Sequence, residues 1–95
     1  MTIPPTIAVI GTGYVGLSTA VLFSELGHVV AAIDRAQDRV EMLAGGHSPI
    51  VEPGLERLLR RGLASGSLSF TNDYTAALRE AEFIFICVRN HTHRL

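Results

Sequence analysis

Residues 6–16 have the sequence Thr-Ile-Ala-Val-Ile-Gly-Thr-Gly-Tyr-Val-Gly, an apolar run that breaks into three closely spaced glycines. The run is rich in β-branched residues, which favours a buried strand, and the residues after it have the apolar spacing of a helix that ends at Gly27. A G-x-G-x-x-G pattern between a strand and a helix is typical of a turn that binds a pyrophosphate. In such a turn Gly11 permits a tight reversal, Gly13 lets the backbone approach the phosphates, and Gly16 lets the helix pack closely.

The start of the predicted helix supplies the charge that such a ligand requires. The first backbone N–H groups of a helix lack intrahelical partners and lie at the positive end of its dipole. We therefore expect the N–H groups of Tyr14, Val15 and Gly16 to hold two phosphate charges without a lysine. Thr12, inside the turn, belongs to the same predicted cofactor site.

A second predicted strand, residues 29–34, ends in an acidic residue roughly 20 positions after the glycines. Asp34 is expected to accept hydrogen bonds from the ribose of an adenosine; the alternative is that it only caps the next helix. A carboxylate attracts a 2′-hydroxyl and repels a 2′-phosphate, which predicts NAD rather than NADP. Arg35 and Arg39 favour NADP to a smaller degree. Arg39 either contacts the adenosine or is a solvated helix charge.

The rest of the chain predicts an α/β domain. Apolar spacing and turn residues predict further elements at 36–44 (helix), 55–63 (helix), 68–71 (strand), 74–81 (helix capped by Asp73) and 83–88 (strand). Right-handed crossovers give a Rossmann-type parallel sheet in the order 3-2-1-4, with helices on both faces, which is the first half only of a doubly wound sheet.

The last predicted strand, 83–88, is apolar on both faces, as is typical of a central strand of a parallel sheet. No further strand follows it in this sequence to pair with its outer side. We therefore expect it to form an exposed edge and to self-associate with a second copy of the chain.

Composition excludes several classes of partner. The 95 residues carry 8 basic and 9 acidic side chains scattered along the chain, which gives no electrostatic footprint for nucleic acid or an anionic membrane. A single cysteine excludes an internal disulfide, and the N-terminus lacks the features of a signal peptide. The apolar segments are too short to span a bilayer. A cytoplasmic location is expected.

Four further segments accompany the glycine pattern: Glu-Leu-Gly-His at 25–28, Ser-Pro-Ile-Val-Glu-Pro-Gly-Leu at 48–55, Leu-Ala-Ser-Gly at 63–66 and Phe-Thr-Asn-Asp-Tyr at 70–74. Together they resemble the N-terminal segment of the UDP-glucose/GDP-mannose dehydrogenase family over residues 6–88. The resemblance implies an enzyme that oxidises the C6 alcohol of a nucleotide sugar to a carboxylate in two NAD-dependent steps, through a thiohemiacetal and a thioester on a cysteine.

The resemblance carries over to cofactor binding only. It assigns Gly11, Gly13, Tyr14, Val15 and Gly16 to the pyrophosphate turn, Asp34 to the ribose and Arg39 to the adenosine half. Cys87 lies in an apolar strand, where a thiol is usually buried and inert, and it does not match the nucleophile of the family. No catalytic residue is therefore expected here, and the chain alone is expected to be inactive, with the nucleotide-sugar substrate binding only in a full-length protein.

The chain departs from the family after residue 88, where relatives continue with Gly-Thr-Pro. We expect residues 1–88 to form the NAD-binding half-domain and residues 89–95 to be a disordered tail that reflects a truncation, a frameshift or a miscalled end. His91 and His93 form an H-x-H pair without a third ligand, so no metal site is predicted.

Two other hypotheses remain open. One is a different NAD-dependent dehydrogenase, of the 3-hydroxyacyl-CoA or 6-phosphogluconate type, against which the loop at 49–55 argues. The other is a stand-alone nucleotide-binding or self-associating module without catalysis.

Overall fold

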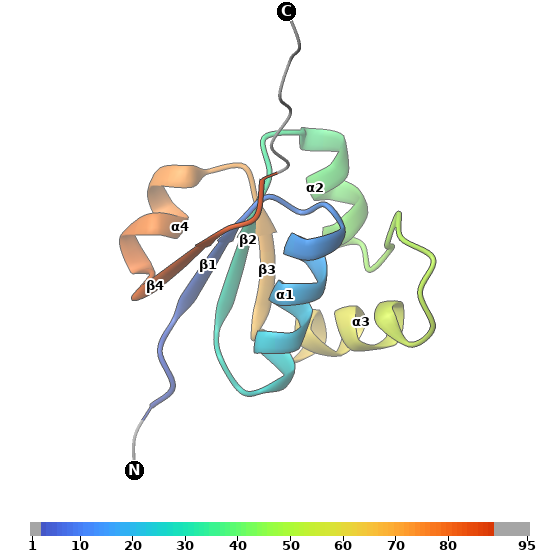
Figure 1. Ribbon diagram of the computed structural model, residues 1–95, viewed down its shortest axis with the longest axis horizontal. Helices are drawn as coiled ribbons and strands as arrows, with labels where there is room; N and C mark the ends of the chain where they lie inside the picture. Colours follow the sequence, from blue (N-terminus) through green and yellow to red (C-terminus); the bar gives the residue numbers. More distant parts are fainter. Residues whose placement is uncertain (1–2, 89–95) are drawn as a thin grey trace, which may run out of the picture.

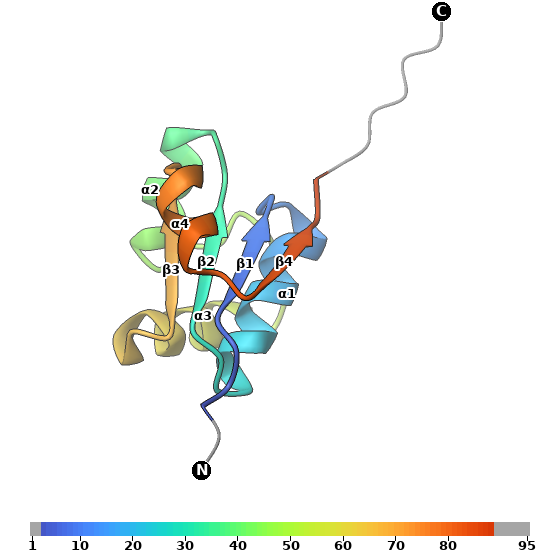
Figure 2. The same ribbon diagram turned by 90° about the vertical axis from the view of Figure 1, so that its left-hand side faces the viewer.

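The computed structural model describes residues 3–88. Its elements, in chain order, are β1 (Ile7–Ile10), α1 (Tyr14–Glu25), β2 (Val30–Ile33), α2 (Gln37–Ala44), α3 (Leu55–Ser65), β3 (Leu68–Thr71), α4 (Tyr74–Glu80) and β4 (Phe83–Ile86). The four strands form one parallel sheet in the order β3-β2-β1-β4 (Figures 1 and 2). The predicted Rossmann-type order is confirmed.

Alternation along the strands divides the core into two layers. Ile7 and Val9 of β1 lie in the larger cluster, which α1, α2 and α3 cover on one face of the sheet. Ala8 lies on the other face, where it packs with Ile33 of β2 and Ala77 of α4. Figure 1 shows α4 alone on its side of the sheet. Helices therefore cover both faces, as the sequence predicts.

Helix ends follow the local sequence. α1 ends where Gly27 adopts a φ of +101°, a conformation that side chains other than glycine rarely adopt. The Gly27 N–H donates to the Ser24 carbonyl and the His28 N–H to that of Phe23, which satisfies carbonyls at the end of the helix. At the start of α4, the Asp73 carboxylate accepts a hydrogen bond from the Ala76 N–H (3.1 Å), so the predicted N-cap is present.

β4 is shorter than predicted and lies at an edge of the described sheet. The sequence predicts a strand to residue 88, but β4 ends at Ile86 because its partner β1 ends at Ile10 and the chain then turns at Gly11. β4 pairs with β1 alone, and all four of its side chains are exposed, so it is not covered as a central strand would be. Phe85 still stacks on Phe23 of α1, with ring centroids 5.0 Å apart.

Two further predictions concern the C-terminal tail and membrane-spanning segments. The tail at 89–95 and its His91 and His93 lie outside the described residues. Over the part of the chain that the structure covers, no helix has both the length and the hydropathy needed to cross a bilayer.

A candidate cofactor site at the carboxyl ends of the strands

An open cavity of about 1070 Å³ lies where the carboxyl ends of the strands meet. Its lining comes from the segments that follow the strands: Gly11, Thr12, Gly13, Tyr14, Val15, Asp34, Arg35, Arg39, Tyr74, Cys87 and Val88. The chain passes from β1 to β2 and β3 on one side of β1 and then returns to place β4 on the other. The cavity therefore lies at the point where the strand order reverses, which is where open α/β sheets bind ligands.

Two of the three glycines are required by the protein itself. Gly11 has a φ of +99°, and a Cβ atom there would lie 2.9 Å from the Cys87 carbonyl oxygen. A Cβ atom on Gly16 would lie 1.8 Å from the Gly11 carbonyl oxygen, closer than any real contact. Both glycines let the turn and the first turn of α1 pack against the end of β4.

Gly13 is different, because nothing in the described structure requires a glycine there. Its φ of −70° suits any residue, and a Cβ atom would meet no atom within 4 Å. The missing side chain opens the backbone toward the cavity. This open space at the start of α1 fits a pyrophosphate, whose oxygens need close access to backbone N–H groups.

The N-terminus of α1 has no competing partner among residues 3–88. Its N-cap, Gly13, offers no side-chain hydrogen bond, and the first turn holds no acidic residue. The first intrahelical bond runs from the Leu17 N–H to the Gly13 carbonyl (2.8 Å), so the N–H groups before Leu17 are not needed by the helix ladder. These donors and the helix dipole suit an anion.

Asp34 lies beside the turn and is held there by three donors. The Thr12 hydroxyl donates to Asp34 Oδ2 (2.6 Å), and so does the Thr12 N–H (3.2 Å). The Ala36 N–H donates to Oδ1 (3.0 Å). Asp34 therefore faces the cavity, as the ribose prediction requires. It does not cap α2, because the N-cap of that helix is Ala36 and, among residues 3–88, no side chain makes a capping hydrogen bond there.

The surroundings keep Asp34 ionised. Partial burial acts to raise the pKa of Asp34, but the hydrogen bond from the Thr12 hydroxyl, those from the Ala36 and Thr12 N–H groups and the charge of Arg39 together hold that pKa below its ordinary value. Arg39 reaches the turn itself, because its Nη1 donates to the Thr12 carbonyl (3.0 Å). The carboxylate and the guanidinium thus lie on the same side of the cavity.

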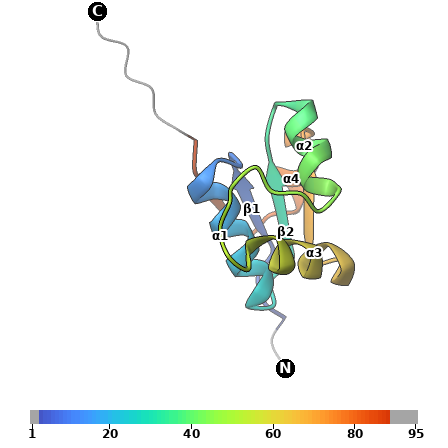
Figure 3. The same ribbon diagram turned by 90° about the vertical axis from the view of Figure 1, so that its right-hand side faces the viewer.

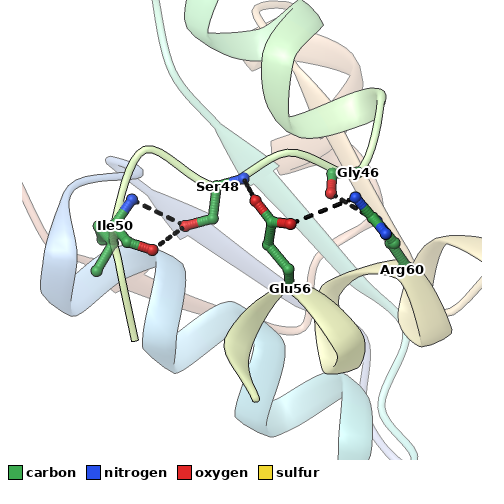
Figure 4. Close-up of polar contacts among 5 residues, drawn as sticks. All are labelled: Gly46, Ser48, Ile50, Glu56 and Arg60. Atoms are coloured by element: carbon green, nitrogen blue, oxygen red, sulfur yellow. Dashed lines mark hydrogen bonds and ion pairs between the residues drawn. The ribbon is translucent and has the colours of Figure 1, made fainter. Parts of the chain in front are cut away.

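The loop between α2 and α3 is fixed by two side chains of α3 (Figure 4). Glu56 accepts a hydrogen bond from the Ser48 N–H (3.0 Å) and pairs with Arg60 (3.3 Å), which donates to the Gly46 carbonyl (3.0 Å). The Ser48 hydroxyl donates to the carbonyl of Ile50 and accepts from its N–H, both at 3.0 Å. The first residues of the segment at 48–55, on which the family resemblance rests in part, are therefore held against α3.

This loop comes close to the glycine turn. In Figure 3 it crosses in front of α1. Glu52 raises the pKa of the Tyr14 phenol above its ordinary value, because its carboxylate is near enough to interact with the phenol and carries a negative charge. Glu52 is therefore a neighbour of the cavity that the sequence did not reveal.

Seven of the eight residues predicted for the cofactor site lie on the cavity wall: Gly11, Thr12, Gly13, Tyr14, Val15, Asp34 and Arg39. The eighth, Gly16, is buried beneath the turn. The prediction missed Tyr74, Val88 and Cys87, which is partly buried on the wall rather than enclosed in the sheet. All three follow a strand, and the rule that the carboxyl ends of parallel strands share one edge identifies them. Among residues 3–88, no group of three potential metal ligands comes together.

The sequence also matches a known family. The NAD-binding domain of the UDP-glucose/GDP-mannose dehydrogenase family aligns with residues 5–93, nearly the whole chain. The chain belongs to this family. Its fold and its cofactor NAD are those of the UDP-glucose/GDP-mannose dehydrogenases, and the family resemblance inferred from the sequence motifs is confirmed.

Individual members of the family are similar to this chain in sequence. The chain is 50% identical over 82 residues to UDP-glucose 6-dehydrogenase YwqF of Bacillus subtilis, an alignment that covers 86% of this chain and 19% of that protein. It is 44% identical to GDP-mannose 6-dehydrogenase of Pseudomonas syringae pv. tomato, with the same coverage of both proteins. The chain thus spans about a fifth of the length of the relatives it matches.

Solved structures show the same fold. A ternary complex of GDP-mannose dehydrogenase from Pseudomonas aeruginosa superposes with a TM-score of 0.89 at 40% identity, over 93% of this chain and 20% of that one. A UDP-glucose dehydrogenase from Pyrobaculum islandicum gives 0.84 at 43% identity, over 88% and 19%. The fold described above is therefore that of these dehydrogenases.

Proposed function

We propose that this chain supplies the NAD-binding N-terminal part of a nucleotide-sugar 6-dehydrogenase. The reaction would oxidise the C6 alcohol of a UDP- or GDP-linked sugar to a carboxylate with two NAD. The names of the relatives support this reaction class, since they include both UDP-glucose and GDP-mannose 6-dehydrogenases. We also propose that the nucleotide sugar binds only in a longer protein and that the reaction takes place in the cytoplasm.

One observation carries the proposal: Gly13 opens the N-terminus of α1 toward a cavity that also holds Asp34. The N–H groups of Tyr14, Val15 and Gly16 would hold the pyrophosphate, and Asp34 the adenosine ribose. NAD, when bound, supplies the hydride acceptor. Residues 1–88 would act as the half-domain that binds the ADP part of the cofactor.

We also propose that the chain does not catalyse the reaction alone. Cys87 lies on the cavity wall, next to the turn that would bind the phosphates. A nucleophilic cysteine needs a nearby base, and within residues 3–88 the cavity lining holds no histidine, lysine or glutamate. Its one carboxylate, Asp34, would be occupied by the ribose. The expected result is no NADH formation from UDP-glucose or GDP-mannose.

The direct test is to titrate the wild-type chain and the Asp34→Ala variant with NAD and with NADP, and to measure binding by ligand-observed NMR. NAD should bind more tightly than NADP by about tenfold or more, because the carboxylate repels a 2′-phosphate. Asp34→Ala should weaken NAD binding by about tenfold, the typical value of a hydrogen bond to a charged group. A folded chain that binds neither cofactor, or both equally, contradicts the proposal.

A second candidate function is a self-associating module without catalysis. The exposed edge of β4 favours it, since Phe83, Ile84 and Ile86 are 55%, 49% and 70% exposed on a strand that, within residues 3–88, pairs on one side only. This function and cofactor binding use different parts of the molecule, so each is tested separately.

A further inference from the structure

Within the glycine turn, Thr12 is the residue that hydrogen-bonds to both charged side chains proposed to bind the cofactor, Asp34 and Arg39. It is 1% exposed, although it lines the cavity. Its hydroxyl and its N–H both donate to Asp34 Oδ2, at 2.6 and 3.2 Å, and its carbonyl accepts from Arg39 (3.0 Å). One buried residue therefore fixes both charged side chains that the sequence assigns to the adenosine half.

The hydrogen bonds also define which oxygen of Asp34 is open to a ligand. Oδ2 already accepts two hydrogen bonds, which fills the two lone pairs of a carboxylate oxygen. Oδ1 accepts one, from the Ala36 N–H. The remaining acceptor position of the carboxylate is thus on Oδ1.

We propose that Thr12 is a positioning residue that sets the choice between NAD and NADP. Its hydroxyl locks the Asp34 carboxylate in one orientation, with Oδ1 open to a ribose hydroxyl. A locked carboxylate cannot rotate away from a 2′-phosphate, so the repulsion is retained in full. Without this bond the carboxylate keeps only the N–H donors of Thr12 (3.2 Å) and Ala36 (3.0 Å), so it turns more easily. Arg35 and Arg39 can then attract the phosphate. This inference rests on the proposed binding of NAD at the turn.

The test compares Thr12→Val, which removes the hydroxyl with little change in shape, and Thr12→Ser, which keeps it. The dissociation constants of NAD and NADP are measured for each by ligand-observed NMR. Thr12→Val should weaken NAD several-fold and reduce the preference for NAD over NADP by about fivefold or more. Thr12→Ser should restore the wild-type preference.

Ser24→Ala is the matched control. Ser24 is also buried, and its hydroxyl shares a hydrogen bond with Ser67 (2.7 Å) near the opposite end of α1. Losing that bond removes a buried hydroxyl contact without touching the cavity, so both dissociation constants should stay at the wild-type values. Thermal unfolding by circular dichroism verifies that every variant is folded at the temperature of the titration.

A second readout does not depend on the cofactor. The Asp34 carboxyl carbon is followed by NMR during acid titration of the free chain. Loss of the hydroxyl should raise the pKa of Asp34 in Thr12→Val, whereas in Thr12→Ser it should remain low. An unchanged titration in folded Thr12→Val would show that the hydroxyl does not hold Asp34, whereas a raised pKa with an unchanged preference for NAD would show a merely structural role.

The outcomes separate the two proposals. If the wild-type chain binds NAD and Thr12→Val keeps both its preference and the low pKa of Asp34, the role of Thr12 is overturned while the cofactor site stands. If the folded wild-type chain binds neither cofactor, the proposed function fails, and with it the selectivity that Thr12 would set, whatever the titration of Asp34 shows. A reduced preference with a raised pKa supports the inference.

Discussion

The three glycines of the turn, Gly11, Gly13 and Gly16, meet different physical requirements. Gly11 and Gly16 are required by the fold, since Cβ atoms there would collide with the backbone of Cys87 and of the turn itself. Gly13 has an ordinary φ and free space around its Cβ position, so no contact within residues 3–88 requires a glycine there. This difference separates stability from function within one short motif.

Alanine substitutions test the difference. Gly13→Ala should change the free energy of unfolding by no more than about 1 kcal/mol, because alanine restricts the unfolded chain at a compatible φ but is a poorer N-cap than glycine. The same change should weaken NAD binding by about tenfold or more, since the methyl group occupies the approach of the phosphates. Chemical denaturation and NAD titration measure the two quantities.

Gly16→Ala is the counterpart and should lower the free energy of unfolding by about 3 kcal/mol or more, because the Gly11 carbonyl lies only 1.8 Å from the new Cβ position. A stable Gly16→Ala chain, or a Gly13→Ala chain that binds NAD as wild type does, would contradict this division of roles.

The sequence predicts a residue of the site only where a local sequence pattern marks that residue. Glycine spacing and an acidic residue at a strand end are local features, so the turn and Asp34 were found. The bonds from Thr12 to Asp34 and from Arg39 to Thr12 join residues 22 and 27 positions apart, and they depend on how two loops meet above the sheet. No local pattern encodes such contacts, nor that of Glu52 with Tyr14.

Among the elements, type and order were predictable, and the bounds of β4 were not. Apolar periodicity identifies β3 at Leu68–Thr71 because its alternation is visible in the sequence. β4 is apolar at every position to residue 88, so its pattern holds no stop signal, and its end is set by the turn of its neighbour at Gly11. Tertiary pairing, not composition, decides its length.

The edge of β4 carries a prediction of its own. If two copies pair through it, the apparent mass by light scattering should rise with concentration. The double variant Ile84→Lys with Ile86→Lys should remain monomeric, because charged side chains on an edge strand oppose pairing. Val51→Lys is the control, since Val51 is exposed in the α2–α3 loop, away from the edge. A wild-type monomer at all concentrations, or a variant that still associates, would contradict pairing through β4.

At the scale of the whole molecule, the strand order places the cavity beside β1, and the described chain offers one side of a dinucleotide site. The turn, Asp34 and Arg39 all line this cavity, where we propose that the ADP part of NAD binds. The chain spans about a fifth of the relatives it matches, whose remaining length has no counterpart in residues 3–88. The contacts that we propose are therefore with the ADP part of the cofactor.

The most direct test is amide chemical-shift mapping of the isotope-labelled chain during titration with NAD and with ADP-ribose. We predict that both ligands shift the same amides, with the largest changes at Gly13, Tyr14, Val15 and Asp34. The two affinities should be similar, because the contacts lie on the ADP part. A folded chain whose largest shifts lie elsewhere, or whose amides do not respond to either ligand, would contradict the central claim that the glycine turn binds the cofactor.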